Sequence, residues 1–193
     1  QQRSVTIIEI MGRHAGWLTA ASKLARKYEG DNPLLIYLPE SPFELESFYR
    51  DLERAFKKSA NVVVCVSEGI ADAGGTFICE YSAKLDSFGH KMLTGCGEVL
   101  ESFVRDRFHV KVRSIELNVS QRCSGMLASR TDIEESAMAG AFGVRAVLSG
   151  ETGKMAAFQR TSDSPYQLSC RLEPVGLICN QEKKFPAEWI SEG

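Results

Sequence analysis

The chain has 193 residues, of which 44% are hydrophobic and 25% are charged, with 16 glycines and six prolines. This length suits one α/β domain, and the composition permits a sizeable core while excluding a disordered or collagen-like chain. With 23 basic and 25 acidic residues the net charge is -2. No global field therefore attracts nucleic acid or an acidic membrane, and any basic site must be local.

No apolar run approaches the roughly 18 residues of a membrane span, and the first ten residues lack a signal-peptide layout. These features predict a cytoplasmic protein with neither a nucleic-acid nor a membrane partner. The six cysteines form no C-x-x-C pair and have no nearby His pair, so no metal site is expected. Because the sequence starts at Gln1 without Met and soon enters a strand-like run, we expect a piece of a longer polypeptide.

Short apolar runs alternate with amphipathic segments along the chain. This alternation predicts an α/β protein with a mostly parallel sheet in a three-layer α/β/α arrangement. Residues 1–160 are expected to form the α/β domain, with residues 161–193 as a C-terminal tail that packs on it or crosses from it. Strands are predicted at 5–10, 34–38, 61–66, 111–117 and near 155–158, and helices at 17–28, 43–59, 99–108 and 131–147.

Ligands of open parallel sheets bind beyond the carboxyl ends of the strands. Here polar or charged groups directly follow four apolar runs, at residues 11–14, 39–40, 67–69 and 118–122. Together these segments offer arginines for a phosphate and a carboxylate for hydroxyl groups. Such a set of groups would complement a phosphorylated sugar.

The segment Ile8–Trp17, which reads IEIMGRHAGW, resembles the substrate-binding signature of the phosphofructokinase family. In register, Val66–Gly69 resembles the family's glutamate loop, and Val112–Arg122 resembles its arginine-bearing strand and loop. The resemblance extends over residues 5–160. The Ser67-Glu68-Gly69 form and the segments at 131–135 and 150–155 are more similar to the bacterial pyrophosphate-dependent branch than to the short ATP-dependent enzymes.

The resemblance implies a substrate-binding role for six residues. One group closes over fructose 6-phosphate, another accepts hydrogen bonds from sugar hydroxyls, and a third binds the 6-phosphate. These are, in turn, Met11, Gly12 and Arg13; Glu68; and Arg113 and Arg122. In the family the counterpart of Arg113 reaches across a subunit interface, so the resemblance also implies a homo-oligomer.

The sequence departs from the family pattern in two places that bear on these predicted roles. Asn118 and Val119 replace a Gly and a His or Tyr before Arg122, which puts one phosphate hydrogen bond in doubt. The glycine-rich donor loop and the Thr-Ile-Asp-Asn-Asp segment, which carries the general base and helps to hold Mg²⁺, do not occur in these residues. We therefore expect no catalytic residue and no metal ligand here, Mg²⁺ bound mainly by the rest of the parent enzyme, and no activity from this chain alone.

The parent enzyme would transfer a phosphoryl group from pyrophosphate, or alternatively ATP, to the 1-hydroxyl of fructose 6-phosphate in glycolysis. The alternative is a non-catalytic module that uses the same fold for regulation or oligomerisation. Roles without a part in substrate binding also remain open for single residues. These are a surface charge for Arg13, a solvated strand end for Glu68 and an ion pair for Arg113. Glu40 follows a predicted strand at a position that the family sometimes uses for effector or sheet-edge contacts.

Overall fold

The computed structural model describes residues 2–81, 84–85, 91–92 and 95–191. The chain forms two compact units, one from residues 1–123 with 183–193 and the other from residues 124–182. Each unit is described by itself. The division expected at residue 160, which lies inside a strand of the second unit, stays a prediction for the protein.

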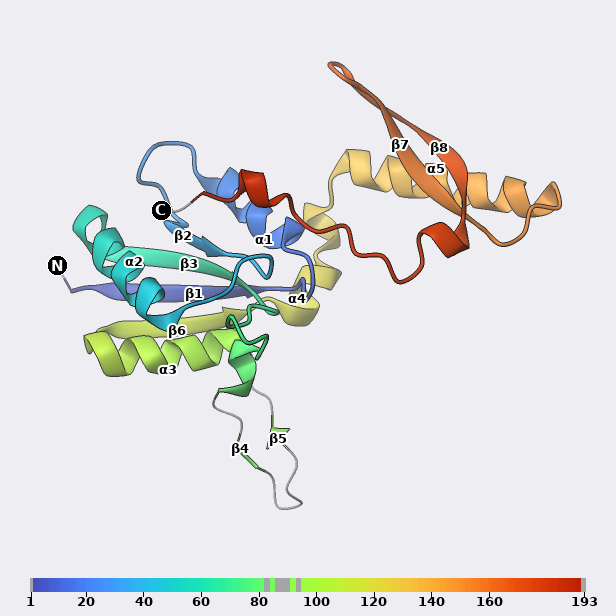
Figure 1. The fold of residues 1–193 in the computed structure, drawn as a ribbon. Coiled ribbons are helices and arrows are strands. Elements are labelled where there is room, and N and C mark those ends of the chain that lie inside the picture. The colour runs from blue at the N-terminus through green and yellow to red at the C-terminus, as the bar shows by residue number, and fades with distance from the viewer. Residues whose placement is uncertain (1, 82–83, 86–90, 93–94, 192–193) are drawn as a thin grey trace. The chain divides into compact units, whose positions relative to one another are not determined.

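The first unit is built on a parallel sheet of four strands (Figure 1). These are β1 (Ser4–Ile10), β2 (Leu35–Tyr37), β3 (Asn61–Ser67) and β6 (Lys111–Glu116), in the order β2-β3-β1-β6. The register places Glu9 beside both Val66 and Glu116. The carboxyl end of β1 therefore lies between those of β3 and β6, which brings three of the predicted polar segments together.

Helices cover both faces of this sheet, which confirms the predicted α/β/α arrangement. Helices α2 (Leu45–Lys58) and α3 (Cys96–Phe108) share one apolar core with the buried side chains of β1 and β3. Phe48 of α2 is fully buried in this core, where such a side chain contributes about 1.5–3 kcal/mol. The short α1 (Trp17–Ala21) contacts β2 and β3 from the other face, where Ile10, Leu38 and Cys65 are buried.

The helix predicted over 17–28 is shorter in the structure. Helix α1 continues as the 3-10 helix η1 (Ser22–Ala25), and the chain then turns away. The carboxylate of Asp31 accepts the backbone N–H groups of Lys27 and Tyr28 at 3.0 and 2.9 Å. This side-chain acceptor competes with helical hydrogen bonding and ends the helix.

The second unit contains α5 (Arg130–Leu148) and an antiparallel hairpin of β7 (Lys154–Asp163) and β8 (Tyr166–Pro174). Ser129 caps α5 by accepting the N–H of Asp132 at 3.4 Å, and α5 contacts both strands of the hairpin. The strand expected near 155–158 is thus one half of a longer hairpin.

The remaining elements are η2 (Ile78–Glu80), β4 (Lys84–Leu85), β5 (Lys91–Met92), α4 (Asn118–Cys123), η3 (Gly125–Leu127), η4 (Val175–Leu177) and η5 (Ala187–Trp189). In the described part of the chain, no helix has the length and apolar character needed to cross a membrane.

Candidate functional site

The loop between β1 and α1 is hydrogen-bonded to the segments that follow β3 and β6. The N–H of Gly12 donates to Oε1 of Glu68 at 3.3 Å, and the hydroxyl of Ser67 donates to the carbonyl oxygen of Gly12. The N–H of Met11 donates to Oε1 of Gln121 at 3.0 Å. Three segments that are far apart in sequence therefore form one connected edge of the sheet.

Two glycines allow close backbone contacts at this edge, Gly12 within its own loop and Gly69 between two segments. Gly12 has a φ of 143°, and a Cβ there would lie 2.8 Å from the carbonyl oxygen of Ala15. A Cβ on Gly69 would lie 2.6 Å from Cα of Arg13 and nearer still to its carbonyl oxygen. Glycine is the residue that fits such positions, because any side chain would push the two backbones apart.

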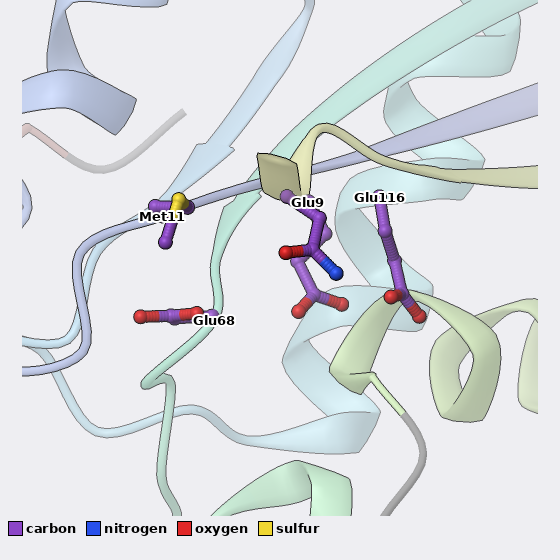
Figure 2. A pocket seen from close by; sticks show the side chains of 5 residues that line it. Glu9, Met11, Glu68 and Glu116 are labelled. Atoms are coloured by element: carbon purple, nitrogen blue, oxygen red, sulfur yellow. The ribbon is translucent and has the colours of Figure 1, made fainter. Parts of the chain in front are cut away.

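A cavity of about 170 Å³ opens at this edge, lined by Glu9, Met11, Glu68, Glu116 and Asn118 (Figure 2). Oε2 of Glu9 accepts the N–H of Gly97, in the first turn of α3, at 2.7 Å. Burial raises the pKa of Glu9 above its usual value, and the nearby charges of Glu116 and Glu68 add to this shift. The cavity wall is therefore rich in hydrogen-bond acceptors, one of which holds a proton more readily than an ordinary glutamate.

The positively charged candidates lie at different distances from this cavity. Nε of Arg122 donates to Sδ of Met11 at 3.4 Å, so Arg122 joins the edge. The backbone of Arg13 lies next to Gly69, while its guanidinium carbon lies 6.0 Å from the ring centroid of Phe77. Carboxylates can accept hydrogen bonds from sugar hydroxyls, whereas a phosphate needs arginine donors. The edge offers both kinds of group.

Arg113 is not brought to the cavity. It lies in the middle of β6 beside Thr6 and is exposed. Its neighbour Ser114 points toward α3, where its hydroxyl donates to Oε2 of Glu101 at 2.6 Å. Because side chains alternate along a strand, Arg113 lies on the other face of the sheet.

Residues 118–122, expected as a loop, instead form most of the short helix α4. Asn118 starts this helix with a φ of 40°, a left-handed conformation that asparagine tolerates better than most residues. The helical turn places the side chains of both Gln121 and Arg122 on Met11. Arg122 was predicted as a site residue, whereas the contact of Gln121 with Met11 was not predicted.

Glu9 and Glu116 line the cavity but were not predicted as site residues. A signal for Glu9 was present, because it interrupts an apolar strand at the alternate positions occupied by Val5 and Ile7, both buried. A carboxylate on the buried face of a strand needs a partner or raises its pKa, which marks it as a candidate for a role in a site. Nothing in the sequence showed that Glu116 would be its neighbour, since that depends on the strand order.

An open parallel sheet flanked by helices, with hydrogen-bonded polar segments at the carboxyl ends of its strands, defines an α/β domain of the doubly wound kind. A profile of the phosphofructokinase family matches residues 1–148. The chain belongs to the phosphofructokinase family.

Named relatives agree with this assignment. The chain is 36% identical over 188 residues to the pyrophosphate–fructose 6-phosphate 1-phosphotransferase of Halomonas elongata, matching 97% of this chain and 45% of that protein. It is 31% identical over 189 residues to a sulfofructose kinase of Alkalicoccus urumqiensis, matching 97% of this chain and 48% of that protein. The crystal structure of a pyrophosphate-dependent phosphofructokinase from Marinobacter aquaeolei matches 99% of this chain and 44% of its own, with 29% identity and a TM-score of 0.81. The chain thus spans less than half the length of these proteins.

Proposed function

We propose that this chain is the fructose 6-phosphate-binding part of a pyrophosphate-dependent 6-phosphofructokinase. The parent enzyme transfers a phosphoryl group from pyrophosphate to the 1-hydroxyl of fructose 6-phosphate and forms fructose 1,6-bisphosphate. We propose it as a cytoplasmic homo-oligomer. The observation that carries the proposal is the hydrogen bond between Gly12 and Glu68, which joins the two segments that the family uses to hold the sugar.

The geometry supports a division of labour among the site residues. Glu68 lines the cavity and accepts one backbone N–H through Oε1, so its remaining acceptor capacity is available to sugar hydroxyls. Gly12 lets the backbone approach the sugar, and Arg122 supplies a cation for the 6-phosphate. Arg13 faces the phosphoryl group that is transferred, and Arg113 serves the site of a neighbouring subunit.

The transfer step itself needs a general base and a metal ion, as phosphoryl transfer does generally. Among the described residues no group of three His, Cys, Asp or Glu side chains is arranged to hold a metal. The described residues therefore offer no such site for Mg²⁺, and no step of the proposed role passes through it. The chain binds and orients the acceptor sugar, and the remainder of the parent enzyme supplies the donor site, the base and the metal.

A second acceptor deserves a direct test because one relative is named a sulfofructose kinase. A 6-sulfonate and a 6-phosphate are both anionic groups that arginine can bind. The same edge residues could therefore hold either sugar.

The proposal is tested with the full-length protein that contains this chain. We expect phosphorylation of fructose 6-phosphate with pyrophosphate, weaker use of ATP, and weaker use of 6-deoxy-6-sulfofructose. Glu68→Gln should raise KM for the sugar about tenfold, because a charge-assisted hydrogen bond contributes more than about 1.5 kcal/mol. Glu53→Gln removes the same charge from an exposed site on α2 and should leave KM unchanged.

Three results would contradict the proposal. A higher kcat/KM with the sulfonate would assign the sulfosugar as the acceptor. Activity with ATP but not with pyrophosphate would reassign the donor. Absence of transfer with either donor and either sugar would favour the regulatory or oligomerisation module. For the isolated chain we expect no transfer with any donor.

A further inference from the structure

Glu40 connects two segments of the chain through one oxygen atom. Its Oε1 accepts the N–H of Gly16 at 2.9 Å and the N–H of Phe185 at 2.8 Å. Its Oε2 is buried and, among the described residues, has no hydrogen-bond partner. The carboxylate is thus engaged by backbone amides within its own unit.

Gly16 is the last residue of the loop that begins at Met11. The first part of this loop is held by Glu68 and Gln121, and its far end is held by Glu40. The contact at the far end is close, since a Cβ on Gly16 would lie 2.8 Å from Oε2 of Glu40. Glu40 therefore fixes where the loop ends, although it does not line the cavity.

The C-terminal segment, residues 183–190, packs against the residue that follows Gly16. The indole N–H of Trp17 donates to the carbonyl oxygen of Lys183 at 2.6 Å. The ring of Trp17 makes edge contacts with Phe185 and Trp189 at centroid distances of 5.0 and 6.2 Å. Figure 1 shows this segment, in red, beside α1.

We propose that Glu40 is a positioning residue for the sugar-binding loop, and that it acts together with the C-terminal segment. This inference rests on the proposed function of the loop. When Glu40, itself bound by the N–H of Phe185, holds Gly16, the loop from Met11 to Gly16 is kept in the conformation that places Gly12 against Glu68. Without this anchor the loop occupies that conformation for a smaller fraction of the time.

The expected kinetic signature follows from this fraction. Apparent affinity falls in proportion to the population of the binding-competent state, while the bound complex reacts as before. Loss of the anchor should therefore raise KM for the sugar and leave kcat nearly unchanged. A purely structural role would lower the unfolding temperature without this split.

The experiment compares Glu40→Ala, Glu40→Gln and the exposed control Glu53→Ala in the full-length protein. We expect Glu40→Ala to raise KM for fructose 6-phosphate about tenfold, with kcat within about twofold. Glu40→Gln retains an oxygen that can accept both backbone N–H groups, and its KM should lie within about threefold of that of the unmutated protein. Gly16→Ala keeps the carboxylate but displaces the loop, and it should reproduce the rise in KM if Glu40→Ala does not fold.

Amide hydrogen exchange tests the anchor without any substrate. In Glu40→Ala, peptides covering residues 11–17 and 183–190 should both exchange faster, while peptides from α3 should not change. Unchanged KM together with unchanged exchange would overturn the inference. If the parent protein shows no sugar phosphorylation, the proposed function fails, and the exchange comparison then decides the anchor by itself.

Discussion

Replacement of Gly69 by alanine tests whether the close approach of the two loop backbones is needed for activity. The new Cβ would lie 2.6 Å from Cα of Arg13, whereas ordinary contacts begin near 3.4 Å. The Arg13 backbone must therefore move by at least about 0.8 Å, and by more at its carbonyl oxygen, which is nearer still. A displacement of about 1 Å in a group that positions substrate can lower activity about a hundredfold.

The assay is pyrophosphate-dependent phosphorylation of fructose 6-phosphate by the full-length protein, with urea unfolding measured in parallel. We expect kcat/KM to fall about a hundredfold, and stability to fall by about 1–3 kcal/mol, as in other overpacked sites. Gly140→Ala in α5 is the matched control, because no described atom beyond its chain neighbours and the adjacent backbone of its own helix lies within 4 Å of its added methyl group. If Gly69→Ala retains kcat/KM within about twofold of the parent, the close approach does not position the substrate loop, and the reasoning fails.

Three further predictions concern the sheet and the helices next to it. Glu9→Gln should stabilise the protein more at about pH 7 than at about pH 5, as measured by thermal unfolding. The pKa of Glu9 is higher in the folded than in the unfolded protein, so the contribution of Glu9 to stability falls as the pH rises above its unfolded pKa. A larger gain at the lower pH would contradict this sign. Phe48→Ala should cost about 3–5 kcal/mol in urea unfolding, because the ring is fully buried, and a cost below about 1 kcal/mol would refute its core role. Arg122→Ala should raise KM for fructose 6-phosphate at least tenfold, by loss of a charge-assisted contact, and an unchanged KM would remove Arg122 from the proposed phosphate site.

Much of the fold could be predicted from local pattern. Strand β3 is a nearly continuous apolar run between Asn61 and Ser67, as expected for a strand covered on both faces. The observed sheet is parallel, and its polar segments meet at the carboxyl edge, as predicted. The strands follow from the periodicity of residues that are neighbours in sequence. The meeting of the distant polar segments follows from the general rule that the carboxyl ends of parallel strands share one edge of the sheet.

Other features depend on partners that sequence pattern does not reveal. Helix α1 ends early because Asp31 captures two amides, a local competition that apolar spacing does not register. Strand β8 was missed although its pattern was visible in the sequence, because the half-buried Leu168, Cys170 and Leu172 alternate with polar residues. Only its pairing with β7 depends on another segment. The approach of Glu9 to Glu116 follows from strand order, which no single segment encodes. The roles assigned to the site residues stay predictions.

The hydrogen bonds that hold the loop after β1 come from partners 24, 56 and 110 residues away along the chain. Contacts of such wide sequence separation form late in folding, because each requires a long segment of chain to be closed first. The loop therefore cannot reach its final shape in any partly folded chain that lacks β3 or β6. Sugar binding would then report completed folding of the whole unit, and a ligand that recognises this loop would select fully folded molecules over any intermediate.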